Sequence, residues 1–142
     1  MRSLIIIALL VSAGCYDNPR PAPDQDETTL VAEIIWDQLQ RFYPAIKDKG
    51  PLLEIEWRPK WCIKEVGRVC ADGYFNSDGR GNLKIICVWF GWSVHETALT
   101  HELNHYRQQI MKEDVSDDPT DAYLEQLRIV QEINNYLAHY GY

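Results

Sequence analysis

The stretch SVHETALTHELNHYRQQIMK, residues 93–112, carries the strongest structural signal in this chain of 142 residues. Ser93, followed three positions later by Glu96, forms a capping box, which predicts a helix that starts directly after Trp92. The helix is expected to end near Lys112, where an acidic and polar stretch begins. Between these limits apolar residues recur at helical spacing, at Ala98, Leu99, Leu103 and Tyr106.

His101 and His105 lie four positions apart on this predicted helix. That spacing separates them by only about 40° around the helix axis, so both imidazoles project from one face and can share a metal ion. A catalytic zinc ion takes three protein ligands and keeps one position open for water. Glu102 would lie beside that open position, where a carboxylate can accept the proton of an attacking water. The pattern predicts a hydrolytic metal site.

The stretch ALTHELNH, residues 98–105, resembles the active-site helix of the zincin metalloproteases, in which small and aliphatic residues precede the first histidine. The resemblance extends over residues 83 to about 130 and leaves out the N-terminal third of the chain. It implies one Zn²⁺ per chain, bound by His101 and His105, with Glu102 as the catalytic general base.

A zincin needs a third ligand further along the chain. The metzincin pattern HExxHxxGxxH is absent, because Gln108 stands in place of its glycine and Met111 in place of its last histidine. The gluzincin branch takes a glutamate 20 residues after the second histidine, which here is Glu125. Asp121, one turn earlier on the same helix, is the alternative third ligand. Ile129 stands where the gluzincin pattern has an aspartate, which leaves the partner of the first histidine unassigned.

A long last helix supports the choice of Glu125. Asp118 can cap this helix, and Pro119 suits its first position. An antiparallel helix that starts there returns to the level of His105 after about seven residues, at Glu125. The apolar stripe of the helix consists of Leu124, Leu127, Ile129, Val130, Ile133 and Leu137.

The first half of the domain predicts one helix and two strands. Apolar residues at helical spacing indicate a helix from Thr29 to Phe42, which Pro44 ends. Residues 52–57, LLEIEW, and residues 83–90, LKIICVWF, predict a short antiparallel sheet. In a zincin, residues 83–88 would be the edge strand that pairs with extended peptide. The expected fold class is α+β: a small zincin-like domain with an N-terminal helix, this sheet, the HExxH helix and a long C-terminal helix.

The first residues of the chain resemble a bacterial signal peptide. Arg2 precedes the apolar run 4–11, and a run of eight residues is shorter than the about 20 that span a bilayer. The string VSAGC, residues 11–15, resembles a lipobox, which implies a signal peptide over 1–14 and acylation of Cys15. Cleavage after Ala13, with plain secretion, is the alternative. The proline-rich and acidic residues 15–28 predict a flexible tether, and residues 29–142 are expected to form one domain.

Composition narrows the classes of partner. The formal net charge is -7 at pH 7, which argues against nucleic-acid binding, because that needs a basic face. Five Trp and eight Tyr favour a packed globular domain over disorder.

Three more cysteines follow Cys15 in the sequence, at positions 62, 70 and 87. In an exported protein three thiols favour one disulfide. Cys70 and Cys87 flank a glycine-rich turn and form one candidate pair; Cys62 with either of them is the alternative. No CxxC or Cys-His spacing indicates a cysteine zinc site.

Together these features predict an exported zinc-dependent metallopeptidase. The expected partners are a peptide or protein substrate and, through a lipid anchor, the membrane of a bacterial cell envelope. Tyr16 after the acylated cysteine favours the outer membrane, with a periplasmic or secreted protein as the alternative. Two other functions share the site: a metal-binding or inactive zincin-like lipoprotein that acts as an interaction module, and a zinc amidase on cell-wall peptides. Candidate donors to the developing oxyanion are Tyr106, Tyr123, Tyr136, His139 and Tyr140.

Overall fold

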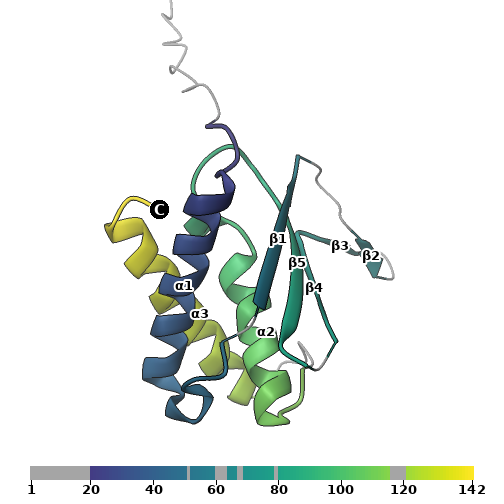
Figure 1. The fold of residues 1–142 in the computed structure, drawn as a ribbon, viewed down its shortest axis with the longest axis vertical. Coiled ribbons are helices and arrows are strands. Elements are labelled where there is room, and N and C mark those ends of the chain that lie inside the picture. The colour runs from purple at the N-terminus through teal and green to yellow at the C-terminus, as the bar shows by residue number, and fades with distance from the viewer. Residues whose placement is uncertain (1–19, 51, 60–63, 67–68, 79, 116–120) are drawn as a thin grey trace, which may run out of the picture.

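The computed structural model describes residues 20–50, 52–59, 64–66, 69–78, 80–115 and 121–142. Along the chain the elements are α1 (Gln25–Phe42), η1 (Pro44–Ile46), β1 (Leu52–Arg58), β2 (Lys64–Val66), β3 (Val69–Ala71), β4 (Gly73–Ser77), β5 (Asn82–Val88), η2 (Val94–Glu96), α2 (Leu99–Met111) and α3 (Asp121–His139). The two η elements are single turns of 3₁₀ helix. Figure 1 shows α1, α2 and α3 gathered on one side of the main sheet. The fold is therefore α+β, as the sequence predicts.

The main sheet is mixed, and the prediction of an antiparallel sheet is wrong for its longest pair. The strand order is β1-β5-β4. β1 runs parallel to β5, with Leu52 level with Asn82 and Arg58 level with Val88, whereas β4 runs antiparallel to β5. Hydrophobic alternation reports which side of a strand is buried, but it is the same for either strand direction. β2 and β3 pair with each other as a separate two-stranded unit.

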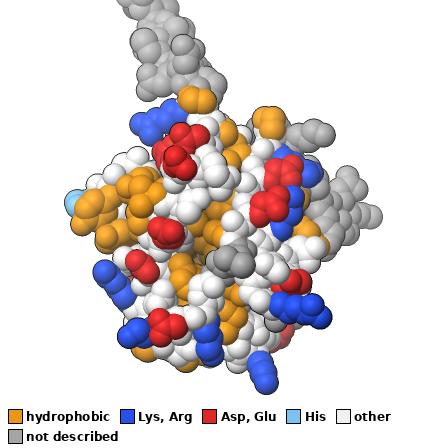
Figure 2. Space-filling model, in the orientation of Figure 1, with side chains coloured by type: hydrophobic (Ala, Val, Ile, Leu, Met, Phe, Trp, Pro, Cys, Tyr) orange, Lys and Arg blue, Asp and Glu red, His pale blue; other side chains and the backbone are white. Residues whose placement is uncertain are grey.

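β5 is the central strand, and it directs one face toward the helices. Leu83, Ile85 and Cys87 alternate along it and are buried in the core. On the opposite face Lys84 forms ion pairs with Glu54 and Glu56 of β1, at 2.7 and 3.5 Å. Figure 2 shows acidic and basic side chains intermixed on the face that it draws, with hydrophobic side chains between them. The core itself lies between β5 and the helices.

α1 begins four residues before the predicted start at Thr29. Asp24 is its N-cap, and a carboxylate oxygen of Asp24 accepts the backbone N–H of Glu27 at 2.9 Å. Thr28 is buried in this first turn, and its hydroxyl accepts the indole N–H of Trp57 at 2.9 Å. Residues 25–28 therefore belong to the folded helix and not to the tether. The sequence signal is the spacing of Asp24 and Glu27, which resembles a capping box inside a proline-rich stretch.

The capping box at Ser93 does not start α2. Ser93 precedes η2 and forms no side-chain cap. Thr97 follows η2 in an extended conformation, and its hydroxyl accepts the backbone N–H of Leu99 at 3.3 Å. The predicted C-terminal end is confirmed, since α2 ends at Met111 with Lys112 in the left-handed conformation. The helix of interest is thus a few residues shorter at its start than the sequence predicts.

The first described residues lie against the carboxyl end of β5. The backbone N–H of Arg20 donates to the carbonyl of Gly91 at 2.7 Å, and the carbonyl of Arg20 accepts the indole N–H of Trp89 at 2.9 Å. Trp89 in turn packs edge-on against Trp57, with ring centroids 5.4 Å apart. Two backbone contacts therefore fix the point at which the N-terminal segment reaches the domain.

Candidate functional site

Helix α2 is buried on almost every side, although much of its sequence is polar. It packs against α1, α3, β4 and β5. Its buried residues are Leu99, Thr100, Glu102, Leu103, Asn104, His105, Tyr106, Arg107 and Gln108. A buried polar side chain costs free energy unless it is hydrogen-bonded or paired. The polar residues of α2 must therefore be matched by specific groups on the neighbouring elements.

The structure brings His101 and His105 together, as the sequence predicts. Their ring centroids lie 4.3 Å apart, with the ring planes at 81° to each other. His105 is 8% exposed, and it stacks against Phe75 of β4 with centroids 5.9 Å apart and ring planes at 23°. Its Nδ1 lies 2.7 Å from Oε1 of Gln108. Two imidazoles from successive turns are thus in contact, and the ring of His105 is held on two sides.

Glu102 is buried where α2 passes under β4, with only 6% of its surface exposed. The residue above it is Gly73, the first residue of β4. A Cβ atom at position 73 would lie 2.6 Å from Oε1 of Glu102 and 2.7 Å from Cβ of Ala98. Only glycine leaves room for this carboxylate, because real Cβ atoms do not approach other heavy atoms so closely. The backbone of β4 and the carboxylate of Glu102 are therefore in direct contact.

Cys87 lies opposite Gly73 in the β4–β5 pair and carries a free thiol. Burial, and then the negative charge of Glu102, raise the pKa of this thiol above its ordinary value. Cys87 is therefore a neutral side chain in the core below the candidate site. The side chains of Cys70 and Cys62 lie outside the described residues. Because Cys87 is a free thiol, this structure does not contain the predicted disulfide between Cys70 and Cys87.

β5 does not have the edge position that the zincin comparison assigned to residues 83–88. It lies between β1 and β4, so its backbone groups already pair on both sides. β4 is the edge strand of this sheet on the side of α2, and it supplies Gly73 and Phe75 to the site. The strand of this site that lies at an edge of the sheet is therefore β4.

Glu125 lies on a face of α3 that turns away from α2. Its side chain is 56% exposed, and its two oxygens accept from Nε and Nη2 of Arg128 at 3.0 and 2.7 Å. These hydrogen bonds lower the pKa of the Glu125 carboxyl. The neighbouring Gln126 is the residue that reaches α2, where it hydrogen-bonds to Gln108 at 2.6 Å. The hydrogen bonds Gln108–Gln126 and Thr100–Asn134 place residue 129 level with His105, so the predicted level of Glu125 is about one turn off.

Asp121 is the first residue of α3, and its side chain lies outside the described residues. Within the described part of the chain, no group of three or more His, Cys, Asp or Glu side chains comes together to hold a metal ion. The structure thus places two of the predicted ligands side by side. The identity of the third ligand stays a prediction.

Most of the candidate oxyanion donors lie away from the histidine pair. Tyr106 is buried in the core and packs against Trp36, with ring centroids 5.7 Å apart. Tyr140 packs against Tyr136 and His139 at the end of α3. Tyr123, near the start of α3, is half-buried and is the remaining candidate. Spacing along the chain does not separate these five residues.

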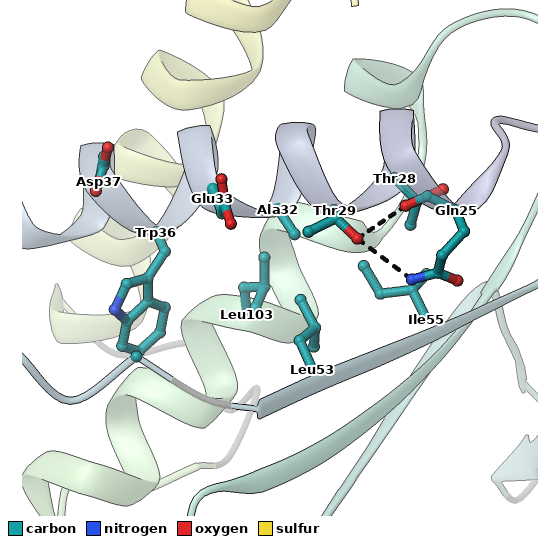
Figure 3. Close-up of a pocket in the computed structure, with 11 residues that line it drawn as sticks. Gln25, Thr28, Thr29, Ala32, Glu33, Trp36, Asp37, Leu53, Ile55 and Leu103 are labelled. Atoms are coloured by element: carbon teal, nitrogen blue, oxygen red, sulfur yellow. Dashed lines mark hydrogen bonds between the residues drawn. The ribbon is translucent and has the colours of Figure 1, made fainter.

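A separate cavity of about 220 Å³ opens between α1 and β1 (Figure 3). Ala32, Leu53, Ile55 and Leu103 form its apolar part, and Glu33 and Asp37 lie along the α1 side. Among the described residues, no histidine or cysteine lines it. Leu103 is two positions from both His101 and His105, which is about 200° around the helix, so this cavity is not part of the histidine site.

Comparison with protein-family models gave no match to this chain, and neither the curated proteins nor the solved structures gave one. None of the helices among the described residues has the length and apolar character needed to cross a bilayer.

Two residues of the site were missed in the sequence. Gly73 is a glycine inside a strand, which is a recognised sign of close backbone approach, but the partner cannot be read from the chain. Gln108 lies three residues after His105, and side chains at that spacing share a helix face. In the sequence, Gln108 was noted only because it stands in place of the glycine of the metzincin pattern HExxHxxGxxH.

The contact at Gly73 generates a test of the site's packing. We expect Gly73→Ala to lower the free energy of unfolding by about 1–3 kcal/mol, because the added methyl group must displace Glu102 or the strand. Gly50→Ala is the matched control, since a Cβ there would lie 3.5 Å from Nε1 of Trp36, an ordinary contact distance. Urea unfolding of both variants measures the difference. Equal stability of the two would contradict the close approach of β4 to Glu102.

Proposed function

We propose that this chain is an exported zinc-dependent metallopeptidase, with His101 and His105 as zinc ligands and Glu102 as the general base. One observation carries the proposal. The imidazoles of His101 and His105 are in contact on α2, and the carboxylate of Glu102 is buried against β4. Imidazole nitrogens are preferred zinc ligands, and a buried carboxylate beside them suits proton transfer. The zincin resemblance of residues 98–105 supports the same function.

The chemistry divides between the ion and the side chains. When bound, zinc supplies a Lewis acid that lowers the pKa of a water molecule to near neutrality. Glu102 would accept the proton of that water and later deliver it to the leaving amine. The contact between Glu102 and the backbone of Gly73 would restrict the carboxylate to a narrow range of positions, which is what a general base requires.

The substrate class follows from the edge strand. β4 lies beside His105 and Glu102, and its outer edge can pair with an extended peptide through backbone hydrogen bonds. Such pairing accepts many sequences, so we propose a peptide or protein substrate without assigning side-chain specificity. A zinc amidase on cell-wall peptides would use the same groups. A zinc-binding but inactive interaction module is the other alternative, and activity measurements separate it from both.

For the third ligand we rank Asp121 above Glu125. To bind zinc, Glu125 would have to give up both of its contacts with Arg128 and turn from an exposed position. Asp121, one turn earlier on the same helix, is the other acid that the sequence offers. A carboxylate from either residue would complete a set of two histidines and one acid.

The general-base assignment is tested by Glu102→Gln. The amide is nearly isosteric and is not a proposed ligand, so zinc should stay near one per chain while peptide hydrolysis falls by about 10²- to 10⁴-fold. Glu96→Gln, the same change at an exposed glutamate before the helix, should leave both quantities unchanged. His101→Ala should lose zinc and activity together. A Glu102→Gln protein that cleaves a peptide library at the wild-type rate would show that Glu102 is not the general base.

The third ligand is tested by comparing Asp121→Ala with Glu125→Ala. Loss of a ligand removes a bond to the metal, whereas the change at Glu125 would remove only an exposed ion pair with Arg128, worth about 0–1 kcal/mol. Calorimetric zinc titration should therefore show the larger loss of affinity for Asp121→Ala. The opposite order would return the assignment to Glu125.

We also propose that Cys15 is acylated and anchors the domain to the membrane of a bacterial cell envelope, with the lipobox-like residues 11–15 as the support. Cys15→Ala should abolish lipidation, because the thioether needs that sulfur, and should release the domain to the soluble fraction. Mass spectrometry of the N-terminal peptide and membrane fractionation measure both effects. A soluble wild-type protein with an unmodified N-terminus would show that the anchor is absent.

A further inference from the structure

A chain of buried amide hydrogen bonds leads from His105 to α3. Gln108 has no exposed surface. Its Oε1 lies 2.7 Å from Nδ1 of His105, and its Nε2 donates to Oε1 of Gln126 at 2.6 Å and to the backbone carbonyl of Asp114 at 3.0 Å. Every polar atom of the Gln108 side chain is therefore engaged, and its three partners come from α2, α3 and the segment between them.

The contact with Asp114 fixes which way the amide of Gln108 points. A backbone carbonyl can only accept a hydrogen bond, so the group that faces it must be the NH₂ group of Gln108. The oxygen of the same amide then faces His105. Since that oxygen can only accept, Nδ1 of His105 must carry the proton. In the neutral ring, Nε2 is then the nitrogen with the lone pair.

We infer that Gln108 is a positioning residue that holds His105 in the Nδ1-protonated tautomer, which places the lone pair on Nε2, the nitrogen that would bind a metal ion. Histidines that bind metals through one nitrogen are commonly fixed by a hydrogen bond from the other, which sets the tautomer and the ring orientation. Phe75, stacked on the ring of His105, adds a second restraint on its plane. The zinc part of this inference rests on the proposed function, whereas the tautomer part does not.

A purely structural role for Gln108 makes a different prediction. Its bond to Gln126 ties α2 to α3, and loss of either glutamine breaks that bond. Only loss of Gln108 also removes the acceptor for Nδ1 of His105. Gln126→Leu is therefore the matched control for Gln108→Leu, because it breaks the same interhelical contact and leaves Asp114 to orient the Gln108 amide.

The experiment measures the tautomer of His105 by ¹⁵N NMR of the imidazole ring in zinc-free, chelator-treated protein. Spectra are recorded over a series of rising pH values, and the tautomer is read from the ring ¹⁵N shifts where they no longer change with pH. We expect wild type and Gln126→Leu to show the Nδ1-protonated tautomer and Gln108→Leu to move toward the Nε2-protonated one. Zinc affinity, measured by competition with a chelator, should fall about 10- to 100-fold in Gln108→Leu and much less in Gln126→Leu.

Two results would overturn the inference: an Nε2-protonated His105 in wild type, or the same tautomer and the same zinc affinity in Gln108→Leu and Gln126→Leu. If Gln108→Leu does not fold, the inference is tested by the tautomer of His105 in wild-type protein alone. If wild-type protein binds no zinc, the proposed function fails, while the tautomer measured in the zinc-free protein still decides the role of Gln108.

Discussion

The burial of a polar helix is the constraint on which the rest of this structure depends. α2 lies between the sheet and the other two helices, and each of its polar side chains needs a partner that a neighbouring element supplies. Thr100 donates to Asn134 of α3 at 2.6 Å, and His105 reaches α3 through Gln108. An unmatched polar group in such a position costs about 1–3 kcal/mol, so these pairs set the register of α3 against α2.

Arg107 shows the same constraint at the far end of α2. Its side chain has no exposed surface, and its guanidinium lies 4.0 Å from the ring centroid of Tyr43, which follows α1. It also donates to Asn104 at 3.1 Å and pairs with Glu113 beyond the end of the helix. The buried guanidinium of Arg107 thus connects the ends of α1 and α2. A leucine at this position could pack but could not make these polar contacts. The matching of polar groups on α2 therefore continues beyond the histidine pair, although Nη2 of Arg107 has no hydrogen-bond partner among the described residues.

The features predicted correctly from the sequence are those that depend on neighbours along one helix. The contact of His101 with His105 and the end of α2 near Lys112 follow from helical spacing. Glu125 was predicted to lie level with His105 and to face it. Successive residues on a helix differ by about 100° in direction, and Gln126 is the residue that faces α2.

The features that were missed depend on contacts between elements. The alternation of hydrophobic and polar residues along β1 and β5 does not reveal that the two strands run parallel. The need for glycine at position 73 is visible only once Glu102 lies beneath it. The role of Gln108 likewise depends on Asp114, which fixes the direction of its amide through a contact that no spacing rule supplies. In each case the decisive partner is distant in sequence or is a backbone group.

The two backbone contacts of Arg20 at the end of β5 determine how a lipid anchor would act on this domain. Only four residues lie between Cys15 and Arg20, and the five steps of chain that join them span at most about 18 Å when fully extended. Acylation of Cys15 would therefore hold Trp89 and the adjoining end of the sheet close to the lipid headgroups. A connection this short would restrict the domain to a thin layer above the bilayer, and the proposed peptidase would then act on substrates according to their distance from the membrane as well as their chemistry.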